Sequence, residues 1–238
     1  MLRHSHALSG GVTGVGWGLV FGWSLPQTLT LGALTAGMAL LPDLDQCGSG
    51  PARSLGFLSE AVAFTIGKLA GGHRHVTHSF LGIALFAGFA YLAGVFRGDI
   101  FGKVGLALLV ALTVAGGLEA LHLARSHVAD AAAMVAAWFV VWHAYHPVLA
   151  LIPLAVVLGC ATHIAGDLCT DSGCMLGCPF SMRRYHLLPE PLAFTTGTAP
   201  ELLIVDPVLT AALAFLLAQA VAPGLVLSLL HQLKGIQL

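Results

Sequence analysis

Histidine and aspartate residues recur at close spacing in three stretches of the sequence. Asp43 and Asp45 are separated by one residue, three histidines lie within residues 73–78, and His163 precedes Asp167 by four residues. We predict an extended turn at the first stretch, which would aim both carboxylates the same way, and a loop entering the first turn of a helix at the second. His163 and Asp167 would share one helix face. Imidazoles mixed with carboxylates suit Zn²⁺, Mn²⁺ or Fe²⁺, whereas Mg²⁺ and Ca²⁺ prefer mostly oxygen ligands.

Each stretch also has an interpretation without a metal. Asp43 and Asp45 could cap or solvate a turn, and the histidines of residues 73–78 could lie at headgroup level in a polar loop. His163 and Asp167 could form a hydrogen-bonded pair that ties two helices together. The metal site disappears only if all three interpretations hold at once, so the sequence favours a metal site. The candidate ligands are too many for one tetrahedral ion. Two ions sharing a bridging carboxylate would use them to activate water and hold phosphoester oxygens.

The composition is that of an integral membrane protein. Hydrophobic residues make up 57% of the 238 residues and charged residues only 9%, where soluble domains carry roughly 25%, and the mean hydropathy is +0.89. A formal charge of -1 provides no basic field for nucleic acid. Five cysteines, an odd number, argue against a disulfide framework. We therefore expect one integral-membrane domain over residues 1–238, and neither a soluble domain, a disordered chain nor a nucleic-acid binder.

Long charge-free stretches position these residues. About 20 apolar residues are needed to cross a hydrocarbon core. The charge-free stretches therefore predict an all-α, polytopic transmembrane bundle of about seven spans: 7–24, 27–41, 79–96, 104–124, 130–146, 148–166 and 207–230. Residues 55–70 are shorter and mixed, and we expect an interfacial helix there. The glycine-rich first two spans suit close helix packing.

The basic residues predict the orientation. Seven spans place Arg3, Arg53, Lys68, Arg74, Arg125, Arg183 and Arg184 on one face, and Arg97, Lys103 and Lys234 on the other. The positive-inside rule puts the first face in the cytoplasm. The same topology brings the three metal-type stretches to the cytoplasmic face and leaves His143, His146 and His231 on or near the other face. For His122, His127, His143 and His146, which line spans with little other polar content, an interpretation without function is favoured.

Four motifs occur in an order that is also found in a known family. They are SH (5–6) opening a glycine-rich span, LLPDLD (40–45), GHRHVTHS (72–79) and HIAGDLCTDSG (163–173). Over about residues 4–201 the chain resembles the YdjM-like family of bacterial inner-membrane proteins, known as membrane-bound metal-dependent hydrolases. Two departures are Gln46, where the family often has a histidine after its Asp-x-Asp, and residues 104–146, which look divergent.

The resemblance implies a ligand set and a catalytic set. The implied metal ligands are His6, Asp43, Asp45, His73, His78, His163 and Asp167. It also draws attention to Arg74, Thr77 and Glu201, which we expect to be catalytic, with Arg74 neutralising a phosphate oxygen.

The 39 residues after Asp167, residues 168–206, are long enough to form a cytoplasmic lid over the metal face. Within this segment, the candidate substrate-binding residues are Arg183, Arg184, Thr196 and Thr198. The arginines could equally be positive-inside anchors, and the threonines could form a plain turn. Cys169, Cys174 and Cys178, with Cys47, could form a second zinc site, but their spacing is unusual and reduced thiols are the default.

The interpretation that uses most of these features is a hydrolase of the bacterial inner membrane. Metal-activated water would attack a phosphoester of a lipid or lipid-linked substrate at the cytoplasmic surface, with one or two divalent ions, zinc first and manganese or iron next. A divalent-metal transporter is an alternative, although transporter sites lie near the midplane. A regulatory or scaffolding protein with a structural metal is another. Membrane lipid is the expected partner, nucleic acid is not, and the oligomeric state is left open.

Overall fold

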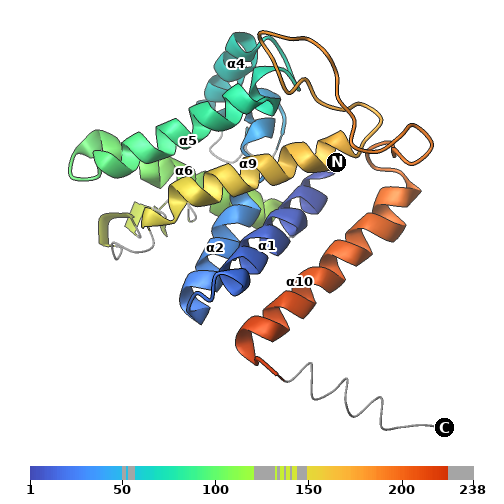
Figure 1. Ribbon diagram of the computed structural model, residues 1–238. Coiled ribbons are helices and arrows are strands. Elements are labelled where there is room, and N and C mark those ends of the chain that lie inside the picture. The colour runs from blue at the N-terminus through green and yellow to red at the C-terminus, as the bar shows by residue number, and fades with distance from the viewer. Residues whose placement is uncertain are drawn as a thin grey trace, which may run out of the picture.

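The computed structural model of the protein describes residues 1–49, 52, 57–120, 132, 135, 136, 138, 139, 141–143 and 149–224. This part of the chain is all-helical, as predicted, with two isolated β-bridges in place of any strand. Its elements are α1 (Arg3–Val20), α2 (Leu25–Met38), η1 (Pro42–Asp45), α4 (Phe57–Ala70), η2 (Val76–His78), α5 (Phe80–Val95), α6 (Ile100–Ala120), α9 (Ile152–Leu168), η3 (Glu201–Val205) and α10 (Asp206–Val221) (Figure 1).

The described helices support the membrane prediction in part. One continuous helix, Glu201–Val221, is long and apolar enough to cross a membrane, and three shorter helices are also apolar: Phe80–Val95, Ile100–Val114 and Ile152–Leu168. Much of the predicted span 130–146, and the end of the last span, lie outside the described residues. The number of seven spans therefore stays a prediction.

Close packing of α1 on α2 depends on small residues. Gly10, Gly14 and Gly18 recur every four residues on α1 and so share the face that meets α2. A Cβ atom on Gly14 would lie 2.8 Å from the Cα of Gly32, so only glycine allows the two backbones to approach this closely. The prediction of close packing in the first hairpin is confirmed.

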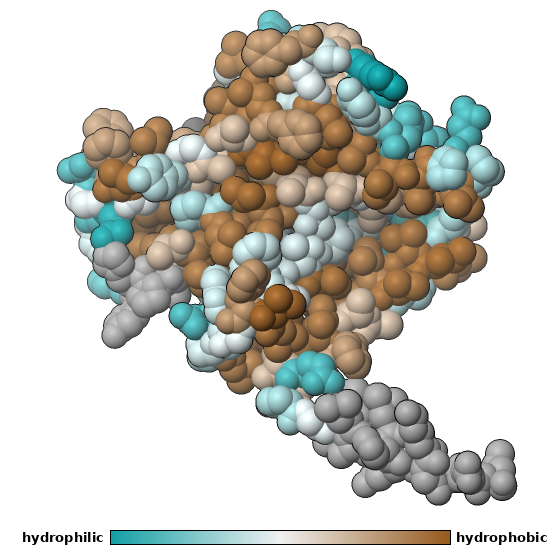
Figure 2. All heavy atoms as spheres, in the orientation of Figure 1, coloured by the Kyte–Doolittle hydropathy of each residue, from teal (hydrophilic) through white to brown (hydrophobic). Residues whose placement is uncertain are grey.

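The apolar core lies where α9 meets its neighbours. Leu31, Met38, Leu106, Ile152 and Val156, from α2, α6 and α9, belong to one buried cluster. Figure 1 shows α9 running between α5 and α1, and α10 standing at the edge beside α1. Brown, hydrophobic atoms cover much of the face drawn in Figure 2, while the most hydrophilic residues lie along its upper right, left and lower edges. This distribution agrees with helices that face lipid over most of their length.

One end of the bundle collects the chemically active residues. The last turns of α2 and α9 lie here with the first turns of α1, α5 and α10, and η1 and η2 pack between them.

Two local predictions at this end are wrong. Pro42 fixes φ for a tight turn, so Asp43 and Asp45 lie in a 3₁₀ turn and not in an extended one. His78 lies in the 3₁₀ turn before α5, because Ser79 caps that helix by accepting the N–H of Gly82 at 3.2 Å.

The remaining elements border this end. Helix α4 matches the predicted interfacial helix in position, packs on η1, and exposes Phe57, Phe64 and Leu69. The loop between α9 and α10 is held by bridges from Thr170 to Phe194 and from Cys174 to Tyr185. It also accepts a hydrogen bond from the N–H of Phe80, at the start of α5, on the carbonyl of Leu176. The loop thus packs beside the histidine-rich end; its action as a lid stays a prediction.

Candidate metal centre

Four side-chain atoms from three elements converge at the collected helix ends. Nε2 of His78 lies 3.1 Å from Nε2 of His163. Oδ1 of Asp43 is 3.6 Å from each of these nitrogens, and Oδ2 of Asp167 is 3.7 Å from each of them. His163 and Asp167 share one face of α9, as predicted, while Asp43 comes from η1 and His78 from η2.

A backbone carbonyl fixes the tautomer of His163. Its Nδ1 lies 2.6 Å from the carbonyl oxygen of Ala39, which follows the last residue of α2 and belongs to the carbonyls that a helix end leaves without an intrahelical partner. A carbonyl only accepts hydrogen bonds, so Nδ1 of His163 carries the proton and donates it. In the neutral ring, the lone pair of Nε2 therefore points into the cluster.

Thr77 and Asp45 fix His78 in the same way. The Thr77 hydroxyl donates to Oδ2 of Asp45, because a carboxylate cannot donate. The same hydroxyl oxygen lies 3.0 Å from Nδ1 of His78, and with its only proton committed it must accept from that nitrogen. The lone pair of His78 Nε2 is thus also directed into the cluster. This chain of hydrogen bonds is of the kind that orients metal-binding histidines.

Two imidazole lone pairs that face each other at 3.1 Å repel unless a cation lies between or beside them. A tetrahedral ion with ligand bonds of about 2.0–2.1 Å holds its ligand atoms about 3.3 Å apart. The ligand atoms of His78, His163 and Asp167, which form one group that could hold a metal, lie 3.1 to 3.7 Å apart, and Asp43 lies 3.6 Å from both histidine nitrogens. Two nitrogens and two oxygens are also a suitable donor set for zinc, manganese or iron. The residues therefore fit a divalent transition metal.

The two oxygens of Asp167 face different groups. While Oδ2 faces the two histidines, Oδ1 accepts from Nη2 of Arg74 at 3.0 Å, lies 3.3 Å from Nε2 of His6, and contacts the amino group of Met1. Two hydrogen-bond donors and a nearby imidazole on Oδ1 leave Oδ2 free to bind a cation. Arg74 also donates to the hydroxyl of Thr170 at 3.4 Å.

The backbone at Arg74 is strained. Its φ of 62° lies in the left-handed region, which costs a residue with a side chain roughly 1–2 kcal/mol. Two glycines with positive φ, Gly71 and Gly72, precede it and complete the sharp turn between α4 and η2. The strained turn directs the guanidinium toward Asp167 and leaves its side chain largely buried.

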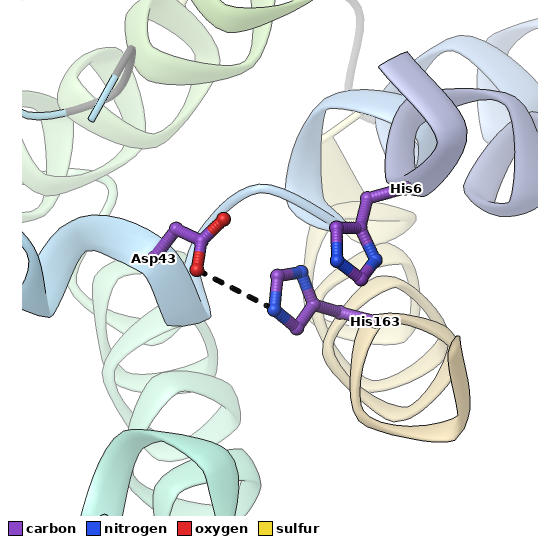
Figure 3. A group of neighbouring side chains, drawn as sticks. All are labelled: His6, Asp43 and His163. Atoms are coloured by element: carbon purple, nitrogen blue, oxygen red, sulfur yellow. Dashed lines mark ion pairs between the residues drawn. The ribbon is translucent and has the colours of Figure 1, made fainter. Parts of the chain in front are cut away.

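His6 lies against the cluster without completing it. Its ring stacks on that of His163, with centroids 3.6 Å apart and planes at 13°, and Figure 3 shows the two parallel rings beside Asp43. Its Nδ1 is buried with no hydrogen-bond partner, a state that costs free energy unless something binds there. His6, Asp43 and His163 each offer a ligand atom within 4.8 Å of the others, so a second ion could use this side.

The charges around η1 and η2 favour bound positive charge. Burial alone would raise the pKa of Asp43, but the imidazoles of His163 and His78 outweigh it and hold that pKa well below its usual range. Burial alone would also raise the pKa of Asp45, but the hydrogen bond from His73 and the neighbouring imidazole of His78 outweigh it and hold that pKa at about 2. At His78, burial is outweighed by Asp43 and Asp45, which raise its pKa to about 9. Without a metal, a proton on His78 therefore separates the two facing nitrogens.

Two predicted ligands lie behind His78. Oδ1 of Asp45 is 2.9 Å from Nδ1 of His73, and its Oδ2 is taken by Thr77, so both oxygens of Asp45 hold neighbours in position. The His73 and His78 rings meet edge to face at 5.1 Å. Asp43, His73 and His78 form another group with ligand atoms within 4.8 Å, so His73 remains within reach of an ion bound by Asp43.

Glu201 is placed as an anchor. Its buried carboxylate accepts from the N–H of Leu2 at 2.6 Å, the hydroxyl of Ser5 at 2.8 Å and the N–H of Gly197 at 2.7 Å. It thereby ties α1, the loop and η3 together. Among the described residues, Glu201 belongs to none of the groups that could hold a metal. Its side chain anchors neighbouring segments, and the structure gives no contact to the cluster that would support the predicted catalytic role.

The predicted substrate-binding residues lie on the loop surface. Arg184 donates to the carbonyl of Ser172 at 2.8 Å, and the guanidinium of Arg183 lies over the ring of Tyr185 at 5.4 Å. The Thr198 hydroxyl donates to the carbonyl of Thr195 at 2.6 Å, and Thr196 is exposed. Since Glu201 occupies the N–H of Gly197, the structure favours the plain-turn interpretation of residues 195–198.

The remaining cysteines and histidines join no described metal group. Cys47 is exposed and Cys169 half-buried, while Cys174 and Cys178 are buried free thiols. Where the structure describes the chain, its possible metal groups contain only histidine and aspartate. Exposed His143 packs on Phe139 with ring centroids 4.4 Å apart. His122, His127, His146 and His231 lie outside the described residues.

Some contributors were missed by the sequence analysis. The Ala39 carbonyl is a backbone group, and no side-chain pattern announces it. His4 pairs with Asp206 at the start of α10, and the Ser5 hydroxyl lies 2.7 Å from the same carboxylate. A signal existed there: the SH motif begins one residue after His4, and Asp206 begins the last apolar run.

Comparisons with known proteins agree with the motifs. No curated protein and no solved structure matches the chain. A family model described as YdjM inner membrane protein matches residues 1–231. Because the match spans nearly the whole sequence, it covers all the elements that build the centre, and the chain belongs to the YdjM inner membrane protein family.

Proposed function

We propose that the protein is a metal-dependent hydrolase that cleaves a phosphoester of a lipid or lipid-linked substrate at the cytoplasmic surface of the inner membrane. The observation that carries this proposal is the convergence of two imidazole lone pairs and two carboxylate oxygens, from His78, His163, Asp43 and Asp167. Such a set binds a cation in preference to being left empty, because the buried carboxylates need compensating charge.

Each side chain has a role in this chemistry. A divalent transition metal, zinc first and manganese or iron next, would supply Lewis acidity and activate water when held there. Thr77 keeps His78 in the tautomer that binds. Arg74 fixes Asp167 and, with five N–H groups on its guanidinium, has donors left for a phosphate oxygen.

The exposure of the cluster supports a catalytic over a purely structural metal. His78, His163 and Asp167 are buried, but the side chain of Asp43 is 20% exposed and that of His73 is 36% exposed. Structural zinc sites are closed by four protein ligands, whereas catalytic sites have three protein ligands and keep the fourth position for water. His78, His163 and Asp167 form such a three-ligand group, and the partly exposed side at Asp43 would admit water. The open side lies at η1, among the helix ends that carry the polar residues. We expect the helix ends of a membrane bundle at headgroup depth, and this position supports a headgroup substrate over a transporter site near the midplane.

The test combines metal analysis with a substrate screen. Protein purified without chelator should contain one or two zinc, manganese or iron ions per chain and should hydrolyse at least one lipid phosphoester in a panel. His78→Ala and Asp167→Ala should abolish turnover while the protein stays folded in the membrane, because helix packing there rests on apolar and small residues. Arg74→Ala should lower turnover by about one to two powers of ten, as expected for lost charge-assisted hydrogen bonds.

His143→Ala is the matched control, because this histidine is exposed and packs on Phe139, away from the cluster. It should hydrolyse normally. If His143→Ala is as damaging as His78→Ala, a path through the membrane is indicated and the transporter interpretation replaces this one. A preparation with no transition metal and no thermal shift on adding one removes the metal premise. If the metal-loaded wild type is active and His78→Ala and Asp167→Ala are equally active, these residues do not carry the reaction and the enzyme proposal is wrong.

A further inference from the structure

A hollow lies at the opposite end of the molecule from the metal centre. Helix α5 begins beside His78 and runs for 16 residues, or about 24 Å at 1.5 Å per residue, to the turn that leads into α6 (Figure 1). At this turn a cavity of about 480 Å³ is bordered by Arg97, Lys103, Leu106 and Trp142. None of the residues that border it is acidic, although Asp99 lies in the same turn.

The hollow has the character of a membrane interface. Nζ of Lys103 lies 3.9 Å from the centre of the Trp142 ring, and Phe96 and Phe101 expose their rings on either side of the turn. Aromatic rings that are apolar on one side and close to cations on the other are typical of the boundary between acyl chains and headgroups. A cavity with two cations at that boundary suits a phosphate group.

An apolar cavity follows along the same helix. It has a volume of about 320 Å³ and is bordered by Val104, Ala107, Leu108 and Ala111 of α6, together with Val135 and Trp138. The rings of Trp138 and Trp142 are 5.2 Å apart, and each borders one of the two cavities. The two cavities are therefore neighbours in the seam between α6 and the two tryptophans. From Lys103 to Ala111 this seam is about 12 Å long.

We propose that this seam binds an anionic phospholipid, with its phosphate at Arg97 and Lys103 and an acyl chain along the apolar cavity beside Ala107 and Ala111. The cations give charge complementarity to a lipid with net negative charge. The adjoining apolar cavity distinguishes a lipid from free phosphate, because apolar cavities exclude water and accept hydrocarbon. The site is separate from the metal centre and is independent of its chemistry.

The test uses lipids whose acyl chains carry bromine, which quenches tryptophan fluorescence on contact. The protein is reconstituted in phosphatidylcholine bilayers that contain a small fraction of brominated phosphatidylglycerol or, in a parallel set, brominated phosphatidylcholine with the same chains. Wild type should show stronger quenching by the anionic lipid, and the Trp138→Phe variant should lose most of that difference. Equal quenching by the two brominated lipids overturns the proposal.

Charge variants locate the headgroup. Lys103→Gln should lower the preference for phosphatidylglycerol about fivefold, as expected for one basic residue near the membrane surface. Lys68→Gln is the matched control, because Lys68 also lies over an aromatic ring, that of Phe64 at 4.7 Å, but on α4. The proposal is overturned if the two variants behave alike with unchanged unfolding temperatures. It is also overturned if millimolar inorganic phosphate removes the preferential quenching, since the site then binds free phosphate.

Discussion

At the scale of single residues, hydrogen bonds decide which atoms of the histidines can bind an ion. The Ala39 carbonyl and the Thr77 hydroxyl accept hydrogen bonds from Nδ1 of His163 and of His78. The Nε2 atoms of the two rings therefore face each other, 3.1 Å apart. The metal-free pKa of His78 is about 9 because Asp43 and Asp45 outweigh the effect of burial. A divalent ion and this proton therefore compete for the same position.

The competition predicts the pH dependence of metal binding. Below about pH 9 His78 is protonated, and an ion must displace that proton, so the apparent affinity should fall about tenfold for each pH unit below 9 and level off above it. Near pH 7 about one proton should be released per ion. Calorimetric titration with zinc, in buffers that differ in heat of ionisation, measures this number. Binding with no proton release would contradict a protonated His78 in the metal-free centre.

Thr77 provides a second test at this scale. Thr77→Val keeps the shape but removes the acceptor for His78 and the donor for Asp45, so metal affinity should fall about 10–100-fold, as for other groups that orient ligands. Thr77→Ser should restore it. Thr65→Val is the control, because the Thr65 hydroxyl on α4 bonds only to the carbonyl of Ala61 among its described partners. The visible spectrum of bound Co²⁺ should change for Thr77→Val, which an unrelated loss of stability would not cause.

The sequence predicted the residue types of the centre, but not which of them face the cluster and which hold the ligands in position. His78, His163, Asp43 and Asp167 follow from type and spacing. Asp45 was expected beside Asp43, because residues two apart point the same way in an extended strand. In a 3₁₀ turn each residue advances about 120°, so the two carboxylates diverge, and Asp45 reaches His73 and Thr77 instead. Which nitrogen of each histidine faces the cluster depends on tertiary contacts that no local pattern encodes.

At the scale of elements, the centre depends on how closely α9 approaches the end of α2. Gly159 faces this contact one helical turn before His163, and a Cβ there would lie 2.6 Å from the backbone nitrogen of Ala39. The same close approach lets His163 reach the carbonyl of Ala39. The position of a ligand is thus set by a glycine on the neighbouring turn.

Gly159→Ala should therefore damage both stability and metal binding. The added methyl forces α9 away from α2, which should cost about 1–3 kcal/mol of unfolding free energy and weaken zinc binding through His163. Gly88→Ala on α5 is the matched control, because a Cβ there meets nothing within 4 Å. The test is to measure the unfolding temperature and the zinc affinity of both variants, which should fall only for Gly159→Ala. Equal behaviour would show that the contact between α9 and α2 is not limiting.

Element positions were predictable to within a few residues where apolar runs were bounded by clear breaks. The break at residues 24–27 appears as the start of α2, where the N–H and hydroxyl of Ser24 both donate to the side-chain carbonyl of Gln27. Pro223 and Gly224 follow the end of α10. The short 3₁₀ turns were not predictable, because a few residues carry no periodicity to distinguish them from loops.

At the scale of the whole molecule, the two ends carry different chemistry. Arg183 lies on the loop beside the metal centre, and Gly98 lies in the turn between α5 and α6. From the positive-inside rule we expect the first end to face the cytoplasm. In intact cells, a membrane-impermeant maleimide should label Gly98→Cys, and should label Arg183→Cys only after permeabilisation. Exposed Cys47 gives the background for the first end. The opposite pattern would invert the orientation.

The distribution of the ligands along the chain also bears on biosynthesis. Asp43 and His78 come from the first third of the sequence, and His163 and Asp167 come 85 or more residues later (from 78 to 163). Chains are made from the N-terminus, so Asp43 and His78 are made well before α9 can pack on α2. Loading of the proposed metal would therefore be a late event in the life of each molecule. A chain that stalls before α9 has no complete centre, and an ion bound there would join the helices made first to those made later.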